Sequence, residues 1–267
     1  MAIKRINLHQ FSLNRNMLIE LKQIKELQHD NLARFYGACL DPVYPMLVTE
    51  YCPRGSLQDI LEEDEMKIDW NFRQSLMTDI LKGLGYLHMT ALMYHGNLKS
   101  SNCVVDSRFV LKLTDFGLLA VRRRAEEEEV DSGSYEYYKS QLWTAPEFLN
   151  GSGGVLKSAS KAGDLYSLAI ILHEIVERRG VWGLNYDSED EDYGEPRSII
   201  AGLCEGSQAG LHQTLHGLYW LSLVSVMILS GVSDGVLEPG PPQHLSLQHE
   251  GAPPPVRADH QVLGSSP

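Results

Sequence analysis

The sequence has few cysteines, too little positive charge for a nucleic-acid binder and no leader-like start. Its four cysteines, Cys39, Cys52, Cys103 and Cys204, have no paired spacing, which argues against a zinc motif or a disulfide framework. Lysine and arginine number 23 against 35 aspartates and glutamates, and the net charge of −12 argues against nucleic acid as a partner. The first residues form a predicted strand with Lys4, so no signal peptide is expected at this start.

The most informative stretch is His95–Asn102, followed by Asp115-Phe116-Gly117. It resembles the protein-kinase catalytic loop, in which His-Arg-Asp precedes an asparagine and a later Asp-Phe-Gly. Here Gly96 replaces the arginine and Asn97 replaces the aspartate that accepts the substrate's proton. An amide has no basic lone pair, and a general base is worth about 10² to 10⁴ in rate. We therefore expect no catalytic residue at this site.

The residues before that loop resemble the N-terminal half of a kinase. Residues 1–4 match the Val-Ala-Ile-Lys strand, whose lysine pairs with the α and β phosphates of the nucleotide. A helix is predicted from about Leu13 to Gln28, and its Glu20 is the best partner for Lys4. The apolar residues of this helix recur at helical spacing: Met17, Leu21 and Ile24.

Short strands are predicted at 32–37 and 46–50 from their β-branched and aromatic residues, with a turn at Asp41-Pro42 between them. In the kinase alignment, Thr49 is then the gatekeeper, the residue at the back of the nucleotide pocket. Residues 50–52 become the hinge that joins the two lobes.

Two helices and a hairpin are predicted in the C-terminal half. Asp69 caps a helix that ends near Met89, and Asp164 opens a second apolar helix. A hairpin that turns at 106–108 brings the two candidate metal ligands, Asn102 and Asp115, together. The apolar residues expected to form the cores of the two helices are Phe72, Leu76, Ile80, Leu84 and Leu87, and Leu165, Leu168, Leu172, Ile175 and Val176. His95 is expected to be structural and to pack beneath the loop.

Three longer stretches go beyond a generic kinase: 49–61, 95–112 and 142–147. Together they resemble the kinase-homology domain of receptor guanylyl cyclases, nearest the natriuretic-peptide-receptor group, over roughly residues 1–203. The resemblance implies an α+β, two-lobed fold with an N-lobe antiparallel sheet that lacks its first strands and an incomplete, mainly helical C-lobe. It also implies a cytosolic segment of a homodimeric membrane receptor that binds ATP and relays ligand binding to a cyclase domain. No part of the chain resembles the domain that converts GTP to cGMP.

The resemblance also supplies a set of site residues. The expected cofactors are ATP and Mg²⁺, and Asn102 and Asp115 are the expected metal ligands. The expected partners are ATP and either a guanylyl cyclase domain or a full-length receptor. The nucleotide-binding residues that it implies are Ala2, Lys4, Glu20, Thr49, Glu50, Cys52, Lys99, Asn102, Val104 and Asp115.

Two missing features predict a weakened domain. No glycine-rich loop precedes Lys4, so nucleotide affinity is expected to be lower than in complete kinase folds. In kinases Glu147 pairs with an arginine late in the C-lobe, and no residue here matches it. A buried unpaired carboxylate costs about 3 to 5 kcal/mol, so we expect a marginal fold.

The predicted kinase-like domain covers 1–203, and the divergent tail 204–267 is expected to be largely disordered. Residues 206–233 carry no charge and have an apolar centre at 218–229, before a proline-rich end. Three interpretations of the apolar segment stay open: a membrane span, an accidental run read from intron or a shifted frame, or a substitute for C-lobe helices. The chain itself is accordingly expected in the cytoplasm or at a membrane.

Three functions remain open at this stage. The first is a regulatory pseudokinase segment of a receptor guanylyl cyclase. The second is a weakly active ATP-dependent protein kinase, for which transfer should vanish in Asp115→Ala and increase in Asn97→Asp. The third is a non-catalytic fragment that pairs with the full-length receptor and dampens it, or an inert product with no function, and co-precipitation with the receptor separates these two.

Overall fold

The computed structural model describes residues 1–6, 14–41, 44–119, 121–122, 134–149, 159–178, 180–181 and 196–204. All of them lie in the unit Met1–Val232. The second half of the predicted Asp41-Pro42 turn and the predicted tail beyond Cys204 fall outside these residues.

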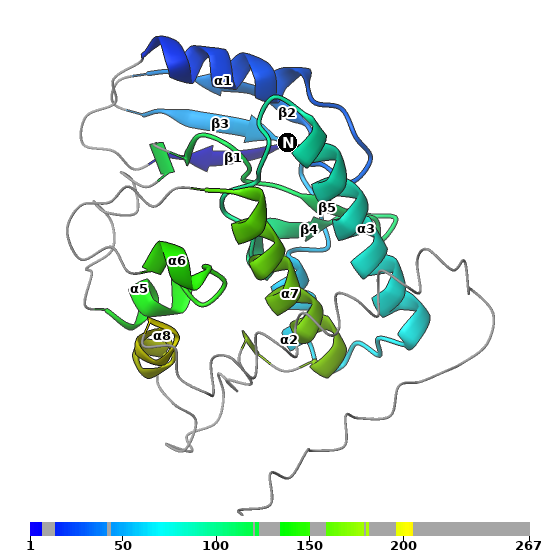
Figure 1. Ribbon diagram of the computed structural model, residues 1–267. Coiled ribbons are helices and arrows are strands. Elements are labelled where there is room, and N and C mark those ends of the chain that lie inside the picture. The colour runs from blue at the N-terminus through cyan, green and yellow to red at the C-terminus, as the bar shows by residue number, and fades with distance from the viewer. Residues whose placement is uncertain are drawn as a thin grey trace, which may run out of the picture. The chain divides into compact units, whose positions relative to one another are not determined.

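A three-stranded antiparallel sheet forms the N-terminal lobe (Figure 1). The strands β1 (Ala2–Arg5), β3 (Met46–Thr49) and β2 (Phe35–Cys39) pair in the order β1-β3-β2. Lys4 of β1 lies opposite Leu47 of β3. All three strands fall within two or three residues of the predicted ones.

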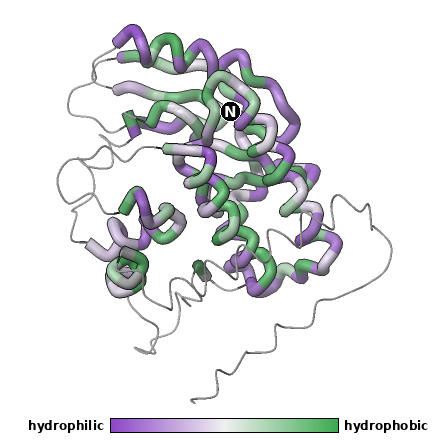
Figure 2. The backbone as a smooth tube through the Cα atoms, in the orientation of Figure 1, coloured by the Kyte–Doolittle hydropathy of each residue, from purple (hydrophilic) through white to green (hydrophobic). Residues whose placement is uncertain are grey.

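Helix α1 (Arg15–Glu26) lies along this sheet (Figure 1). Its first turn is closed by Asn14, whose Oδ1 accepts a hydrogen bond from the Met17 N–H at 2.8 Å. The helix buries the three predicted residues: Met17, Leu21 and Ile24. Figure 2 shows the expected alternation of hydrophilic and hydrophobic residues along it. The predicted first residue, Leu13, lies outside the described residues.

Helix α3 (Trp70–Met89) forms as predicted. Asp69 accepts a hydrogen bond from the Phe72 N–H at 2.8 Å. Gly83 allows a close approach, because a Cβ there would lie 2.6 Å from the carbonyl oxygen of Asn31. Four of the predicted core residues are buried, and Phe72 is partly buried: Leu76, Ile80, Leu84 and Leu87.

Helix α7 (Lys161–Glu177) packs against α3 and begins earlier than predicted. Its cap is Ser160, whose Oγ accepts a hydrogen bond from the Gly163 N–H at 3.0 Å. Asp164 therefore lies inside the helix, where its carboxylate binds another segment. Leu165 was predicted to be in the core but is 43% exposed. Leu165 shares the exposed face of the first helical turns with Lys161 and Ala162, which precede it by four and three residues.

The hairpin of β4 (Cys103–Val105) and β5 (Leu111–Leu113) also forms as predicted. Its turn is held by Asp106, whose Oδ1 accepts hydrogen bonds from the N–H groups of Arg108 at 2.8 Å and Val110 at 3.0 Å. One hydrophobic cluster includes residues of α1, this hairpin, α3 and α7. The α+β fold is confirmed.

The remaining described elements are short helices: α2 (Leu57–Glu62), η1 (Ser100–Asn102), α5 (Tyr135–Ser140), α6 (Pro146–Leu149) and α8 (Pro196–Cys204). Glu147 in α6 is exposed, so the predicted cost of a buried unpaired carboxylate does not apply. None of the helices in the described part of the chain is long and apolar enough for a membrane span. The cysteines at 39, 52 and 103 are free thiols.

Candidate nucleotide site

The phosphate end of the cleft, which we define as Lys4, Asp115 and Arg122, brings two cations onto one carboxylate. Lys4 from β1 and Arg122 both contact Oδ2 of Asp115, and the Arg122 Nη1 lies 3.1 Å from it. Burial alone would raise the pKa of Asp115, but the two neighbouring cations outweigh it and hold that pKa below its usual range. Asp115 is therefore ionised and engaged before any ligand arrives.

The predicted pair between Lys4 and Glu20 is not formed. Oε1 of Glu20 instead accepts a hydrogen bond from the Leu118 N–H at 2.6 Å. Gly117 makes this approach possible: its φ is +70°, and a Cβ there would lie 2.9 Å from Cδ1 of Ile24. The helix α1 carboxylate thus holds the start of the segment after Asp-Phe-Gly, and Lys4 turns to Asp115.

The catalytic loop keeps its backbone frame around Asn97. The Asn102 side-chain amide donates to the Asn97 carbonyl oxygen at 2.7 Å, and the Thr114 N–H donates to the Asn102 carbonyl oxygen at 2.9 Å. Asn102 is thereby tied to the backbone immediately before Asp115. Asn97 occupies the expected place of a kinase base but presents an amide.

The loop is anchored from below by Asp164 of α7. Its carboxylate accepts hydrogen bonds from the N–H groups of His95 at 2.7 Å and Gly96 at 2.9 Å, and it contacts Nε2 of His88 at 2.8 Å. The His95 ring is buried and meets the Phe116 ring edge to face. Burial lowers the pKa of His95 to about 4, against the attraction of Asp164. His95 is a neutral packing residue, as its predicted structural role requires.

A second buried carboxylate, Glu174, ties α7 to two other segments. It accepts hydrogen bonds from the Ser100 Oγ at 3.0 Å and the Trp143 Nε1 at 2.7 Å. Burial raises the pKa of Glu174 to about 8, even though both hydrogen bonds act to lower it. Near neutral pH this residue therefore carries a proton in the folded protein.

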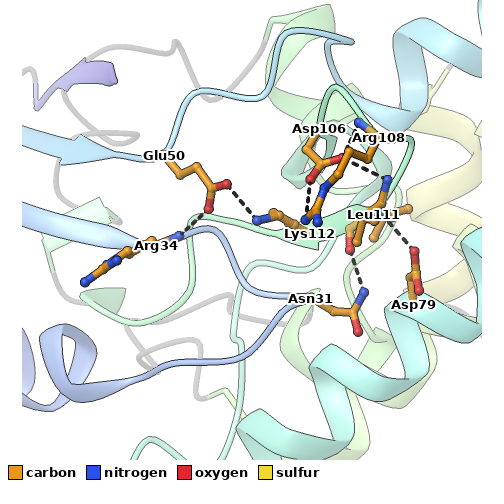
Figure 3. Close-up of polar contacts among 9 residues, drawn as sticks. Asn31, Arg34, Glu50, Asp79, Asp106, Arg108, Leu111 and Lys112 are labelled. Carbon is orange, nitrogen blue, oxygen red and sulfur yellow. Dashed lines mark hydrogen bonds and ion pairs between the residues drawn. The ribbon is translucent and has the colours of Figure 1, made fainter.

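The hinge side of the cleft is fixed by an ion pair between the lobes (Figure 3). Oε1 of Glu50 lies 2.6 Å from Nζ of Lys112 on β5, and Oε2 accepts a hydrogen bond from the Arg34 N–H at 3.1 Å. Figure 3 also shows the Asn31 side chain donating to the Leu111 carbonyl oxygen, at 3.0 Å. The Glu50 side chain thus supports the hinge, which leaves its backbone as the part that can contact a nucleotide.

The hinge backbone leads directly into the floor of the cleft. The Arg54 N–H donates to the Val105 carbonyl oxygen at 3.2 Å, and the Val105 N–H donates to the Gly55 carbonyl oxygen at 3.0 Å. Val104, the residue before Val105 on β4, is only partly buried. Cys52 is buried, and burial and then the Glu50 charge raise the pKa of its thiol to about 11. Cys52 is therefore an unreactive neutral thiol.

The predicted site residues fall into separate groups. Lys4, Thr49, Asp115 and Arg122 line one cavity of about 20 Å³. Lys99 lines a second cavity, on the side of Asn97. The hinge and floor residues form the third group: Ala2, Glu50, Cys52 and Val104. Ala2 lies opposite Thr49 across β1 and β3.

Sequence reasoning missed Arg122 and Lys112. Arg122 belongs to a run of three arginines that follows Asp115 by seven residues, and no motif distinguishes it from its neighbours. Lys112 lies on a three-residue strand with apolar neighbours, and a lysine predicted at such a buried position signals a partner. The sequence could therefore have indicated a charged partner for Lys112, but not a role for Arg122.

Comparisons with known proteins show which family the chain is similar to. The Protein kinase domain family matches residues 1–203. Atrial natriuretic peptide receptor 2 of Rattus norvegicus is 52% identical over 179 residues, which are 67% of this chain and 17% of that receptor. Receptor-type guanylate cyclase gcy-28 of Caenorhabditis elegans is 48% identical over 204 residues, 74% of this chain and 16% of that protein.

The speract receptor of Strongylocentrotus purpuratus is 43% identical over 178 residues, 67% of this chain and 16% of that receptor. The chain thus spans about a sixth of the length of these relatives. It belongs to the protein kinase domain family and corresponds to the kinase-homology region of the receptor guanylate cyclases.

Proposed function

We propose that this chain is a nucleotide-binding, non-phosphorylating regulatory segment of a receptor guanylate cyclase. The observation that carries the proposal is the catalytic loop: its frame from Asp164 to Asn102 is intact, yet Asn97 presents an amide where a kinase needs a base. A folded cleft without a proton acceptor can bind a nucleotide without transferring its phosphate.

ATP is the proposed ligand because the cleft offers groups for both of its ends. At the hinge, the Glu50 carbonyl and the Cys52 N–H take part in none of the hydrogen bonds among the described residues, so one acceptor and one donor remain for a base edge. At the other end, Lys4 supplies a cation for phosphate oxygens. The proposed ligand site therefore runs from residue 52 to the phosphate end.

The proposed regulatory partner is a guanylyl cyclase domain in the same receptor, on the cytosolic side of a membrane. The relatives' names support this, because each named protein is a receptor or a receptor-type guanylate cyclase. In such a receptor the segment would change the cyclase rate when nucleotide binds. The change would need the cleft to favour one of two lobe arrangements.

Binding is tested by calorimetric titration of ATP into the purified chain, with Lys4→Gln as the test variant. Lys82→Gln is the matched control, because Lys82 is exposed on α3 outside the cleft and its loss removes the same charge. We expect binding by wild type and by the control, and at least about tenfold weaker binding by Lys4→Gln. Equal affinities of all three proteins would contradict a cleft site.

The absence of phosphoryl transfer is tested with labelled ATP and a mixed peptide library. Wild type should transfer phosphate at least about 10² to 10⁴ times more slowly than ordinary kinases, which turn over at about 1 to 100 per second, because the general base is absent. Asn97→Asp restores a carboxylate in the intact loop and serves as the informative variant. Transfer by wild type at kinase-like rates, lost on Asp115→Ala, would replace this proposal with the weak-kinase hypothesis.

A further inference from the structure

Arg122 contacts Asp115, the carboxylate that a kinase uses as a metal ligand. Its Nη1 lies 3.1 Å from Oδ2 of Asp115, and its Nε donates to the Gly117 carbonyl oxygen at 3.0 Å. The Arg122 side chain is 13% exposed, so the guanidinium is held inside the cleft. Two directed contacts fix it across the Asp-Phe-Gly turn.

Two cationic side chains meet at one carboxylate in the phosphate end. Lys4 shares the same Asp115 oxygen with Arg122, so two cations face one carboxylate. Glu20 is the acidic residue predicted to balance Lys4, but its carboxylate is bound to the Leu118 N–H. Within the phosphate end, Lys4 and Arg122 together carry one more charge than Asp115, and the Glu20 carboxylate beside Gly117 offsets part of this excess.

The two cations beside Asp115 do not suit a magnesium site of the kinase type. The oxygen donors expected for Mg²⁺ are present in Asn102 and Asp115, and carboxylate and amide oxygens suit that ion. However, a divalent cation on Asp115 would lie beside Lys4 and Arg122, and like charges at such distances repel strongly in a partly buried site.

An anionic group would find cationic partners at the same place. Lys4, Asp115 and Arg122 line one cavity, and an anion there would neutralise the excess charge. Arginine presents donors in a planar fork suited to phosphate oxygens. The N–H of Nε and one N–H of Nη1 are used within the protein, so the second Nη1 hydrogen and both Nη2 hydrogens remain for a ligand among the described contacts.

We propose that Arg122 takes the place of the metal ion, so that this chain binds the polyphosphate of a nucleotide through Lys4 and Arg122 without magnesium. The inference rests on the proposed nucleotide site and specifies its ligand as the metal-free nucleotide. Asp115 then positions the two cations and does not coordinate a metal.

The test is calorimetric titration of ATP in EDTA and in excess Mg²⁺, for wild type, Arg122→Gln and the charge-matched control Lys82→Gln. For wild type and the control we expect dissociation constants in EDTA no weaker than those in Mg²⁺, within about twofold. For Arg122→Gln we expect at least about tenfold weaker binding in EDTA, because one phosphate donor is lost. Magnesium should restore part of that loss, since Asp115 is then free of the guanidinium.

The wild-type arm alone can overturn the inference, even if Arg122→Gln does not fold. Wild-type binding that needs Mg²⁺ would mean that the ion displaces Arg122, which sinks this inference and leaves the proposed nucleotide site standing. Unchanged metal-free affinity in a folded Arg122→Gln protein would do the same. Absence of ATP binding under both conditions would overturn the inference and the proposed function together.

Discussion

Two aspartates lie at opposite sides of the same loop and are held in different ways. Asp164 accepts hydrogen bonds from two backbone N–H groups of the loop and contacts His88, and its side chain is 3% exposed. Asp115 is bound by the ends of two long side chains, Lys4 from the N-terminal lobe and Arg122 from the segment after it.

This difference in partners indicates that Asp164 stabilises the fold and that Asp115 belongs to the ligand site. Backbone donors are fixed by the chain, so Asp164 cannot lose them while the loop keeps its form. Side-chain cations can rotate away at a cost of about 1 kcal/mol or less per exposed ion pair, so Lys4 can exchange Asp115 for a phosphate. The hydrogen bonds of Asp164 therefore persist as long as the loop is folded, whereas the ion pair between Lys4 and Asp115 can be exchanged for a contact with a ligand.

The largest loss of stability is expected when the contacts of Asp164 are removed. Asp164→Asn keeps the shape of the side chain but removes its charge and turns one amide donor toward a buried N–H group. We expect a loss of about 3 kcal/mol in the free energy of unfolding, because hydrogen bonds to a buried charge are the strong ones. Chemical denaturation measures this loss. A cost near that of the Lys82→Gln control would show that the loop does not depend on Asp164.

Glu174, like Asp164, is a buried carboxyl that stabilises the fold, and its raised pKa predicts a pH dependence of the stability. It is protonated in the folded protein up to pH about 8, whereas its ordinary pKa is 4.5. Between these values unfolding releases a proton, so stability falls by about 1.4 kcal/mol for each unit of rising pH. The expected loss is therefore about 2 to 3 kcal/mol between pH 6 and pH 8.

Glu174→Gln should remove this slope, because glutamine imitates the protonated acid. Its carbonyl oxygen can accept from Trp143, and its amide can donate to Ser100. Denaturation series at pH 6, 7 and 8 compare the two proteins. Parallel curves for wild type and variant would mean that Glu174 does not hold a proton in the folded state.

The core elements were the part that could be predicted from sequence, because periodicity and caps are local signals. Helix α3 follows its Asp69 cap, and α1 buries the three residues that its spacing indicates. The start of α7 was predicted wrongly since Asp164 has the side chain of a cap, although it binds a loop 68 residues away. Local patterns do not distinguish these two uses of an aspartate.

The candidate site was only partly predictable for the same reason. Residue types and spacing indicated Lys4, Asn102 and Asp115, but the partner of Lys4 depends on how the lobes and α1 meet. The Leu118 N–H that takes Glu20 from Lys4 is a backbone group and has no sequence signature. Arg122 was missed because its role follows from the turn at Gly117, which only the fold displays.

The hinge ion pair gives an intermediate case between the two aspartates. Lys112 is 10% exposed and Glu50 is 24% exposed, and they come from different lobes. Lys112→Met should cost about 1 to 2 kcal/mol, because Glu50 keeps the Arg34 N–H but loses its cation. Adding Glu50→Gln should recover part of the loss. A double variant that is as unstable as the sum of both single variants would show that the two residues do not interact.

The smallest effect on stability is expected from Asp115→Asn, the matched counterpart of Asp164→Asn. Lys4 is exposed, and the buried Arg122 keeps its hydrogen bond to the Gly117 carbonyl oxygen, so we expect a loss of about 1 kcal/mol near neutral pH. The pKa of Asp115 is held below its usual value, so its contribution is present above the unfolded pKa of about 3.8 and is lost as pH falls through the lower folded pKa. The stability difference between wild type and Asp115→Asn should therefore shrink in acid. Asp164→Asn and Asp115→Asn, measured together at pH 7, test the comparison directly: equal losses would mean that Asp115 is as architectural as Asp164, and Lys4 would then not be free to bind phosphate.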